Sequence, residues 1–337
     1  MKLVRTEDAV GQVLCHDITQ IIPGVVKDAV FRKGHIVTEE DIPVLLSVGK
    51  ENLYIWEKQE GMLHENEAAE ILRQICQGEH MHPSEVKEGK IELIADCEGV
   101  LKINTEKLNA VNNLGEMMIA SRHGNFPVKT GDKIAGTRII PLVIEEEKMQ
   151  KACEVAGKEP IFRILPYQKK KAGIVTTGSE VYYHRIEDKF TPVVIEKLKE
   201  CGVTEVKQIQ CNDDHEMIME AIQTLIEDGS DLIVCTGGMS VDPDDRTPLA
   251  IKNACTEVVT YGAPVLPGAM FMLAYCEKEG RQIPVMGLPG CVMYAKRTIF
   301  DLVLPRIMCD EKLHEKDFRL LGQGGLCLSC PVCTFPN

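Results

Sequence analysis

Three short segments rich in glycine and hydroxyl residues each follow an apolar run of the kind that forms a buried strand. They are Thr177-Gly178-Ser179-Glu180, Thr236-Gly237-Gly238-Met239-Ser240 and Leu288-Pro289-Gly290. Glycine lets backbone N–H groups approach a ligand without an intervening Cβ, and hydroxyl groups add further donors. A helix that follows such a segment offers unpaired N–H groups that favour an anion. Singly each segment is no more than a turn, but together the three predict a phosphate-binding site.

Carboxylates stand close to these segments, although a carboxylate alone repels phosphate. Glu180 lies in the first segment, and Asp242, Asp244 and Asp245 follow the second. A Mg²⁺ ion held by one or two carboxylates together with phosphate oxygens would reconcile the two negative charges. Asp245 and Asp242 are therefore candidate magnesium ligands. The alternative is that one aspartate caps the helix beginning at Thr247-Pro248 while the others face solvent, and it stays open for Asp242 and Asp244.

From residue 172 onward, apolar strands alternate with amphipathic helices. Strands are predicted at 172–177, 203–209, 231–235 and 283–287, and helices are predicted to begin at Thr191-Pro192, at Asp213 or Asp214, at Thr247-Pro248 and near Val292. Strands that are apolar throughout indicate a parallel sheet covered on both faces, with ligands bound beyond the carboxyl ends of the strands. The predicted class is α/β, a three-layer domain with a mostly parallel sheet, preceded by a β-rich α+β region.

The chain is too long for one compact core, so several domains are expected. We predict an N-terminal α+β segment over 1–80, a β-rich domain over 81–168 with a helix near 105–121, the α/β domain over 169–312, and a cysteine-containing tail over 313–337.

The overall charge limits the classes of partner. With 51 acidic and 38 basic residues, the net charge of −13 disfavours binding to nucleic acid or to an anionic membrane. The N-terminus lacks the apolar core of a signal peptide, and no apolar run approaches the roughly 20 residues that cross a bilayer. We therefore expect a cytoplasmic protein.

The tail carries a second group of residues that could do chemistry, namely Cys327, Cys330 and Cys333. Their C-x-x-C-x-x-C spacing suits thiolate ligation of zinc or of an iron–sulfur cluster, and both normally take four ligands. Cys309, His314, another subunit or a residue beyond Asn337 could supply the fourth. The alternative of a disordered, reduced tail stays open.

In chain order, these motifs resemble a known family. The three segments, together with Asp245-Arg246-Thr247-Pro248, are similar to the molybdopterin-binding domain shared by molybdopterin adenylyltransferase, molybdopterin molybdenumtransferase and gephyrin. The resemblance covers about residues 170–310. It implies the molybdopterin-binding fold, a place in molybdenum cofactor biosynthesis, and molybdopterin or adenylylated molybdopterin as ligand or substrate.

The resemblance also implies roles for individual residues. In that family the Gly-Gly segment contacts the pterin-phosphate side, and an aspartate after it serves metal-dependent chemistry; by position this aspartate resembles Asp245. A glutamate in the first segment resembles Glu180, so Asp245 and Glu180 are the implied catalytic pair. The implied cofactor-binding residues are Thr177, Gly178, Ser179, Thr236, Gly237, Gly238, Met239, Ser240, Asp213, Asp214, Pro289 and Gly290.

The layout is closest to the molybdenumtransferase branch, with clear departures. No Asp-Gly-Tyr-Ala-like motif occurs in residues 1–100, and the C-terminal domain of that branch is missing. Cys291-Val292 stands where the branch has Asn-Pro, and Ala269-Met270 stands where it has Lys-Pro. Binding of the cofactor is therefore a firmer expectation than the metal-insertion reaction.

Two functions of different classes follow. One is Mg²⁺-dependent insertion of molybdate into molybdopterin. The other is a non-catalytic molybdopterin carrier or sensor whose cysteine tail responds to metal or redox state. A third, the hydrolase activity of competence-damage-inducible proteins that reuse this domain, is disfavoured by the N-terminal half. The resemblance further implies a homo-oligomer.

Overall fold

The computed structural model describes residues 2–22, 26–55, 60–240, 242–243, 245–333 and 335. Asp244, one of the aspartates considered above, lies outside these residues. The chain divides into two compact units. Unit 1 comprises 1–97, 101–124 and 128–164, and unit 2 comprises 98–100, 125–127 and 165–337.

Unit 1 is rich in strands. Its strands are β1 (Lys2–Arg5), β2 (Ile18–Ile22), β3 (Val26–Phe31), β4 (Asn52–Ile55), β5 (Met62–His64), β6 (Met81–Pro83), β7 (Lys90–Ala95), β9 (Met117–Ser121), β11 (Lys133–Ile139) and β12 (Val143–Glu145). Its helices are η1 (Thr6–Asp8), α1 (Asp41–Ser47), α2 (Glu65–Cys76), α3 (Thr105–Asn112) and α4 (Glu146–Ala156). Three strands have residues in both units: β8 (Gly99–Ile103), β10 (Phe126–Val128) and β13 (Phe162–Pro166).

A four-stranded antiparallel sheet, β6-β7-β11-β9, carries the larger core of unit 1. Leu72 and Cys76 of α2 are buried in one cluster with Ile91 and Leu93 of the sheet. The helix predicted near 105–121 is wrong in its second half, because α3 ends at Asn112 and β9 follows. The Asn112 side chain bonds both the N–H (2.8 Å) and the carbonyl (2.9 Å) of Ile119, which holds the returning strand against the helix end.

Unit 2 is built on one six-stranded sheet. Its strands are β14 (Lys171–Thr177), β15 (Glu205–Cys211), β16 (Leu232–Thr236), β17 (Glu257–Tyr261), β18 (Met272–Lys278) and β19 (Arg281–Leu288), in the order β15-β14-β16-β19-β18-β17. The first four in this order are parallel, and β18 and β17 add antiparallel pairs at one side. The predicted mostly parallel sheet is confirmed.

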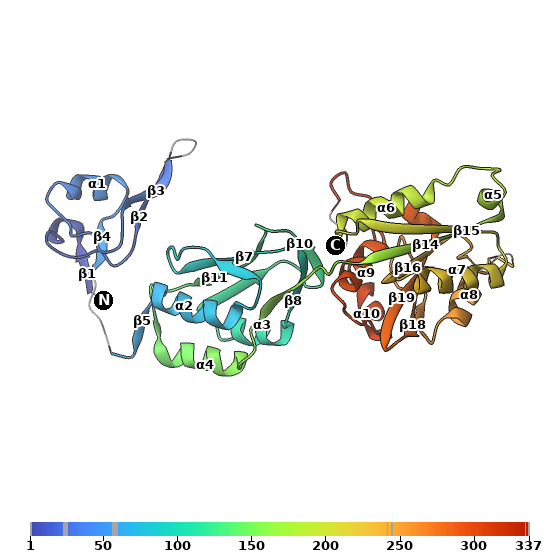
Figure 1. The fold of residues 1–337 in the computed structure, drawn as a ribbon. Coiled ribbons are helices and arrows are strands. Elements are labelled where there is room, and N and C mark those ends of the chain that lie inside the picture. The colour runs from blue at the N-terminus through green and yellow to red at the C-terminus, as the bar shows by residue number, and fades with distance from the viewer. Residues whose placement is uncertain are drawn as a thin grey trace. The chain divides into compact units, whose positions relative to one another are not determined.

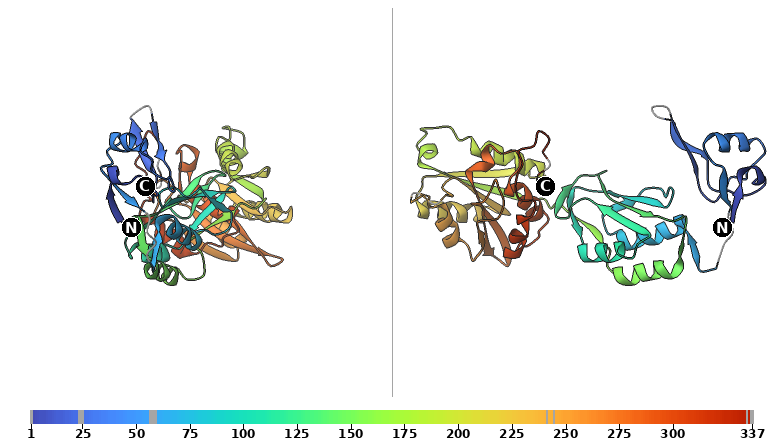
Figure 2. Two further views of the ribbon diagram at one scale, coloured as in Figure 1. Left: turned by 90° about the vertical axis from the view of Figure 1, so that its left-hand side faces the viewer. Right: turned by 180° about the vertical axis from the view of Figure 1, so that it is seen from behind.

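Helices cover both faces of this sheet, so unit 2 has three layers (Figure 1, Figure 2). Its helices are α5 (Ser179–Tyr182), α6 (Phe190–Glu200), α7 (His215–Glu227), α8 (Thr247–Ala254), η2 (Gly290–Met293), α9 (Ile299–Met308), α10 (Glu315–Arg319) and η3 (Leu320–Gly322). Side chains of α6 and α9 pack with Ile174 and Val234 on one face. Side chains of α7 and α8 pack with Val175 and Ile233 on the other. Because side chains alternate along a strand, adjacent apolar residues serve opposite layers.

The start of α6 differs from its prediction. Thr191 was expected to cap the helix, but α6 begins at Phe190. The carboxylate of Asp188 accepts the N–H groups of Phe190 and Thr191, each at 3.0 Å. The Thr191 side chain is buried instead, with its hydroxyl 2.8 Å from that of Thr176. A carboxylate three residues upstream thus does the capping, and the threonine joins helix to sheet.

The last long helix also begins later than predicted. Residues 290–293 form only the short turn η2, and α9 starts at Ile299. Thr298 and Asp301 form a capping box, in which the Asp301 carboxylate accepts the Thr298 N–H at 2.7 Å. This box is a stronger start signal than the apolar pattern around Val292, because it satisfies two unpaired donors. Among the helices of the described residues, none is long and apolar enough to cross a membrane.

Asp301 also takes part in a buried ion pair that joins α6 to α9. The ammonium of Lys197 lies 2.6 Å from the Asp301 carboxylate and 3.1 Å from the Lys296 carbonyl. Both charged side chains are 8% exposed, and Arg297 also reaches Asp301 at 2.9 Å. A buried charge that loses its partner is strongly destabilising.

Replacement of Lys197 by Met should therefore lower the stability of unit 2 by about 3 kcal/mol, the lower end of the usual cost because Arg297 still contacts Asp301. Amide hydrogen exchange of the α6 and α9 peptides measures the loss locally. Lys199→Met, an exposed site on the same helix, is the control. Equal protection in the two variants would contradict a structural role for the pair.

Candidate functional site

The carboxyl ends of the four parallel strands lie at one edge of the sheet of unit 2. The register pairs Thr177 with Cys211, Thr176 with Thr236, and Thr236 with Leu288. The segments that follow these strands therefore leave from the same edge. They include the three glycine segments and a fourth, Asn212–Asp214, after β15. This edge is the candidate site.

Three buried threonines hold the first and second segments together. The Thr177 hydroxyl donates to the Thr236 carbonyl at 3.0 Å and lies 3.1 Å from the Thr247 hydroxyl. Because a hydroxyl has one proton, Thr247 is the donor in the second contact. All three residues are at most 4% exposed. This chain of bonds joins β14, the end of β16 and the start of α8, and its Thr247 member had been predicted only as a helix start.

Gly237 and Gly238 are required by this close approach. Both have positive φ, +87° and +56°. A Cβ on Gly237 would lie 2.4 Å from the Thr177 carbonyl oxygen, and a Cβ on Gly238 would lie 2.8 Å from the Thr247 hydroxyl. Any larger residue would push the second segment away from the first.

Met239 belongs to the core by its side chain. It is 4% exposed, and its thioether lies over the backbone of Gly287, where a Cβ would come within 2.5 Å. Only the backbone of Met239 is therefore available at the edge. The Tyr261 hydroxyl donates to the Met239 carbonyl at 3.1 Å. No motif in the sequence indicated this tyrosine.

Asp245 closes the second segment on itself. Its carboxylate accepts the N–H of Ser240 at 2.8 Å, and its own N–H donates to the Asp242 carbonyl at 2.9 Å. Burial, together with the nearby Asp245 charge, raises the pKa of Tyr261. Asp242 and Ser240 are exposed. Asp245 thus has a structural contact, and a role in metal binding stays a prediction.

The first segment is tied to the fourth by an aspartate. The Asp213 carboxylate accepts the Ser179 N–H at 2.8 Å. Asp214, in contrast, caps α7 by accepting the N–H groups of Glu216 (3.0 Å) and Met217 (3.1 Å), which confirms the predicted cap. Of the two aspartates, Asp213 is the one held against the first segment.

Glu180 and Gly290 of the third segment are the exposed residues of their segments at this edge. The Glu180 carboxylate folds back toward Gly178, where a Cβ would come within 2.9 Å of it, and Glu180 is exposed. Pro289 is buried, while Gly290 is exposed with open space where a Cβ would stand. Glu180 and Gly290 are therefore accessible from solvent.

One hydroxyl at this edge is unusual. Among the described residues, the Thr236 hydroxyl is the buried side-chain oxygen or nitrogen that has no hydrogen-bond partner. Because side chains alternate along β16, the Thr236 side chain lies on the same face of the sheet as Leu232 and Val234. The Thr177 side chain lies on the opposite face. A buried polar group without a partner is destabilising, so this hydroxyl needs an explanation.

The described side chains include no group of three or more His, Cys, Asp or Glu residues that could hold a metal ion. A magnesium ion at this edge would therefore need phosphate oxygens and waters in addition to Asp245 or Asp242. Cys327, Cys330 and Cys333 lie elsewhere, at a pocket of the C-terminal segment.

Gly237→Ala tests the close approach of the first two segments. Gly229, with φ +87° as well, has nothing within 4 Å of a Cβ, so Gly229→Ala is a control with the same backbone strain. Both changes should cost about 1 kcal/mol through the left-handed backbone. Gly237→Ala should cost about 2 kcal/mol more through overpacking. Equal thermal midpoints of the two variants would show that the approach is not tight.

Comparison with known proteins adds an independent finding. Residues 173–308 match the family model described as "Probable molybdopterin binding domain", and residues 3–57 match one described as "Domain of unknown function (DUF8806)". CinA-like proteins of Mycobacterium sp. (strain MCS) and Mycobacterium tuberculosis are 35% identical over 85 residues, which is 25% of this chain. The chain spans about a fifth of the length of these relatives, since the match covers 20% of each.

Two solved structures are similar in fold to part of the chain. The tungsten cofactor synthesizing protein MoaB from Pyrococcus furiosus is 22% identical, with 37% of this chain and 84% of that chain covered and a TM-score of 0.33. The protein CinA from Thermoplasma acidophilum is 15% identical, with 42% of this chain and 98% of that chain covered and a TM-score of 0.33. The matched family model coincides with the α/β domain of unit 2. Residues 173–308 of this chain therefore form a domain of the probable molybdopterin binding domain family.

Proposed function

We propose that unit 2 binds molybdopterin or adenylylated molybdopterin at the carboxyl edge of its sheet, and that the chain serves molybdenum cofactor biosynthesis. The observation that carries the proposal is the Gly237-Gly238 pair, held at this edge in a conformation that a Cβ would prevent. Backbone without side chains gives a phosphate close access to N–H groups. The family match over 173–308 supports the choice of ligand.

The proposed ligand also explains the Thr236 hydroxyl. It is buried without a partner at the end of β16, next to Leu288 in the register and so to the third segment. A ligand, or a water that accompanies it, would supply the missing hydrogen bond when the segments adjust on binding.

Thr236→Val tests whether the Thr236 hydroxyl bonds the ligand or is only buried without a partner. The unliganded protein should gain about 1 kcal/mol, because an unsatisfied hydroxyl is removed without loss of volume. Molybdopterin affinity should fall about 5-fold to 10-fold through one lost hydrogen bond. In Thr176→Val, stability should instead drop, since the Thr176 hydroxyl bonds Thr191 and Gln208, each at 2.8 Å. A Thr236→Val protein with unchanged affinity would remove this hydroxyl from the site.

For the reaction, we propose that a Mg²⁺ ion between Asp245 and ligand phosphates permits insertion of molybdate. Asp245 lies next to the glycine pair, and its Ser240 bond uses one carboxylate oxygen. A carboxylate has further lone pairs for a cation. Glu180, exposed beside the first segment, is the second proposed catalytic group. Homo-oligomer formation is part of the same proposal.

The second candidate is a non-catalytic molybdopterin carrier or sensor. It is favoured by Ala269-Met270 and Cys291-Val292, which replace the cationic and amide side chains of the molybdenumtransferase pattern. In this function Asp245 acts only through its bond to the Ser240 N–H.

Asp245→Asn distinguishes the two functions. Asparagine keeps an acceptor for Ser240 but loses the negative charge. If Asp245 holds magnesium, the variant should bind molybdopterin without the Mg²⁺-dependent increase seen in the wild type, and molybdate turnover should be lost. Titrations with Mg²⁺ and with a chelator measure this. Asp228→Asn, at an exposed site on the far end of α7, should behave as wild type. A variant with the full Mg²⁺ effect would favour the carrier.

A further inference from the structure

Two cysteine sulfurs lie against each other beside the sheet of unit 2. Cys255 stands directly after α8, Cys276 stands on β18, and their Sγ atoms are 2.7 Å apart. The Cys276 thiol also donates to the Ala254 carbonyl at 3.4 Å. Because each thiol has one proton, Cys255 is then the donor between the two sulfurs. Both cysteines are free, so the contact joins two thiols.

The backbone on either side of the pair holds it in place. Thr256, the residue after Cys255, donates its N–H (3.0 Å) and its hydroxyl (2.9 Å) to the carbonyl of Tyr275, the residue before Cys276. At the end of α8, the Cys255 N–H donates to the Ile251 carbonyl at 3.1 Å. From these fixed positions the sulfurs need to approach by less than about 1 Å to reach the length of an S–S bond, about 2 Å.

The pair is buried on one side and accessible on the other. Cys276 is 5% exposed and belongs to a core cluster with Ala274 and Val285, whereas Cys255 is half-buried. The hydrogen bond from Cys255 lowers the pKa of the Cys276 thiol, although burial acts in the opposite direction. The thiolate is the reactive form of cysteine, and a small oxidant can approach from the Cys255 side.

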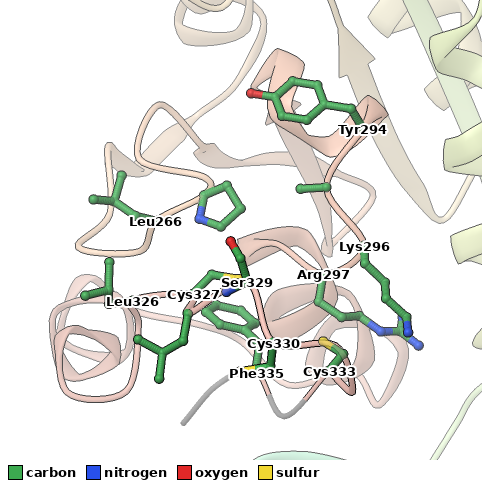
Figure 3. Close-up of a pocket in the computed structure, with 13 residues that line it drawn as sticks. Leu266, Tyr294, Lys296, Arg297, Leu326, Cys327, Ser329, Cys330, Cys333 and Phe335 are labelled. Carbon is green, nitrogen blue, oxygen red and sulfur yellow. Dashed lines mark hydrogen bonds between the residues drawn. The ribbon is translucent and has the colours of Figure 1, made fainter.

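The cysteines of the C-terminal tail provide a contrast. Cys327, Cys330 and Cys333 line a pocket of about 610 Å³ (Figure 3), but a shared wall does not bring sulfurs into contact. The part of the chain that the structure describes contains no group of three or more His, Cys, Asp or Glu residues suited to a metal ion. Two thiols alone are too few for structural zinc, so Cys255 and Cys276 are a dithiol rather than a metal site.

We propose that Cys255 and Cys276 form a reversible disulfide that fastens β17 to β18. As the S–S bond forms, both S–H bonds break, and the two protons and two electrons reduce one hydrogen peroxide to two waters. Exchange with a dithiol reductant restores both S–H groups and leaves the reductant as its own disulfide.

The position of the disulfide connects it to the second segment. The closed loop, residues 255–276, contains the whole of β17 and most of its pairing with β18. Tyr261, whose hydroxyl donates to the Met239 carbonyl, lies inside this loop. Oxidation therefore restrains the strand that supports the second segment. The proposal concerns the chain alone and does not depend on molybdopterin binding.

The test is alkylation of the full chain in denaturant, before and after treatment with hydrogen peroxide. Trypsin releases Cys255 and Cys276, with no other cysteine, in the peptide 253–278, because no Lys or Arg precedes Lys278 in it. We expect two alkyl groups on this peptide from the reduced protein and none after oxidation, with the unalkylated mass lower by two hydrogens. Dithiol reductant added before alkylation should restore both groups.

The peptide 208–246 is an internal control, because it carries Cys211 and Cys235 and no other cysteine. Both are buried in the same core cluster as Cys276, and this peptide should keep two alkyl groups at the same dose. Two alkyl groups on the peptide 253–278 at every dose would overturn the proposal. So would oxygen adducts in place of the disulfide, since they would show that the two sulfurs react singly.

Variants test the effect on the strand. Oxidation should raise the thermal midpoint of the wild type by about 5 °C, because it closes a loop in the unfolded chain, and should slow amide exchange in β17. Cys255→Ser should lose both effects, whereas Cys153→Ser, at an exposed cysteine on α4, should keep both. If the disulfide forms and amide exchange in β17 stays unchanged, the proposed fastening of this strand is wrong.

Discussion

The Thr177 hydroxyl makes the contact on which the candidate site depends. It bonds the end of the neighbouring strand at Thr236 and meets the first residue of α8 at Thr247. These bonds bring two glycine segments so close that Gly237 has no room for a Cβ. The strain of a positive φ at Gly237 and Gly238 is low because glycine lacks that atom. A single buried hydroxyl thus sets where exposed backbone can meet a ligand.

Acidic residues also hold the segments at the carboxyl edge of the sheet, because their carboxylates accept backbone N–H groups. Asp213 and Asp245 bind N–H groups of the first and second segments, and Asp214 caps α7. These bonds keep the segments in place in a chain of net charge −13. Among the described residues, Glu180 and Asp242 are exposed carboxylates beside the edge for which no bond to a backbone N–H is described. A magnesium ion at Asp245, as proposed above, requires this carboxylate to serve the Ser240 N–H and the ion at once.

Sequence patterns predicted most of unit 2, because apolar strands and capped helices are local features. The parallel sheet, its covering by helices on both faces, and a cap at Asp213 or Asp214 were all anticipated, and the structure places the cap on Asp214. Errors arose where a nearby side chain competed for the same backbone. Asp188 displaced Thr191 as a cap, and the Thr298–Asp301 box moved the start of α9. Such competition depends on side-chain geometry that an apolar period does not contain.

The sequence by itself determined which residues stand at the ends of the strands, since strand ends follow from apolar runs and glycine. Only the tertiary structure decided which of these residues point outward. Met239 turns into the core over Gly287, Tyr261 arrives from another strand, and Thr236 keeps an unpaired hydroxyl. The same holds for the tail, whose cysteine spacing was evident but whose pocket depends on residues about 30 to 60 positions earlier in the chain. Contacts between residues distant in sequence form only when the sheet and its covering helices pack, so no local pattern records them.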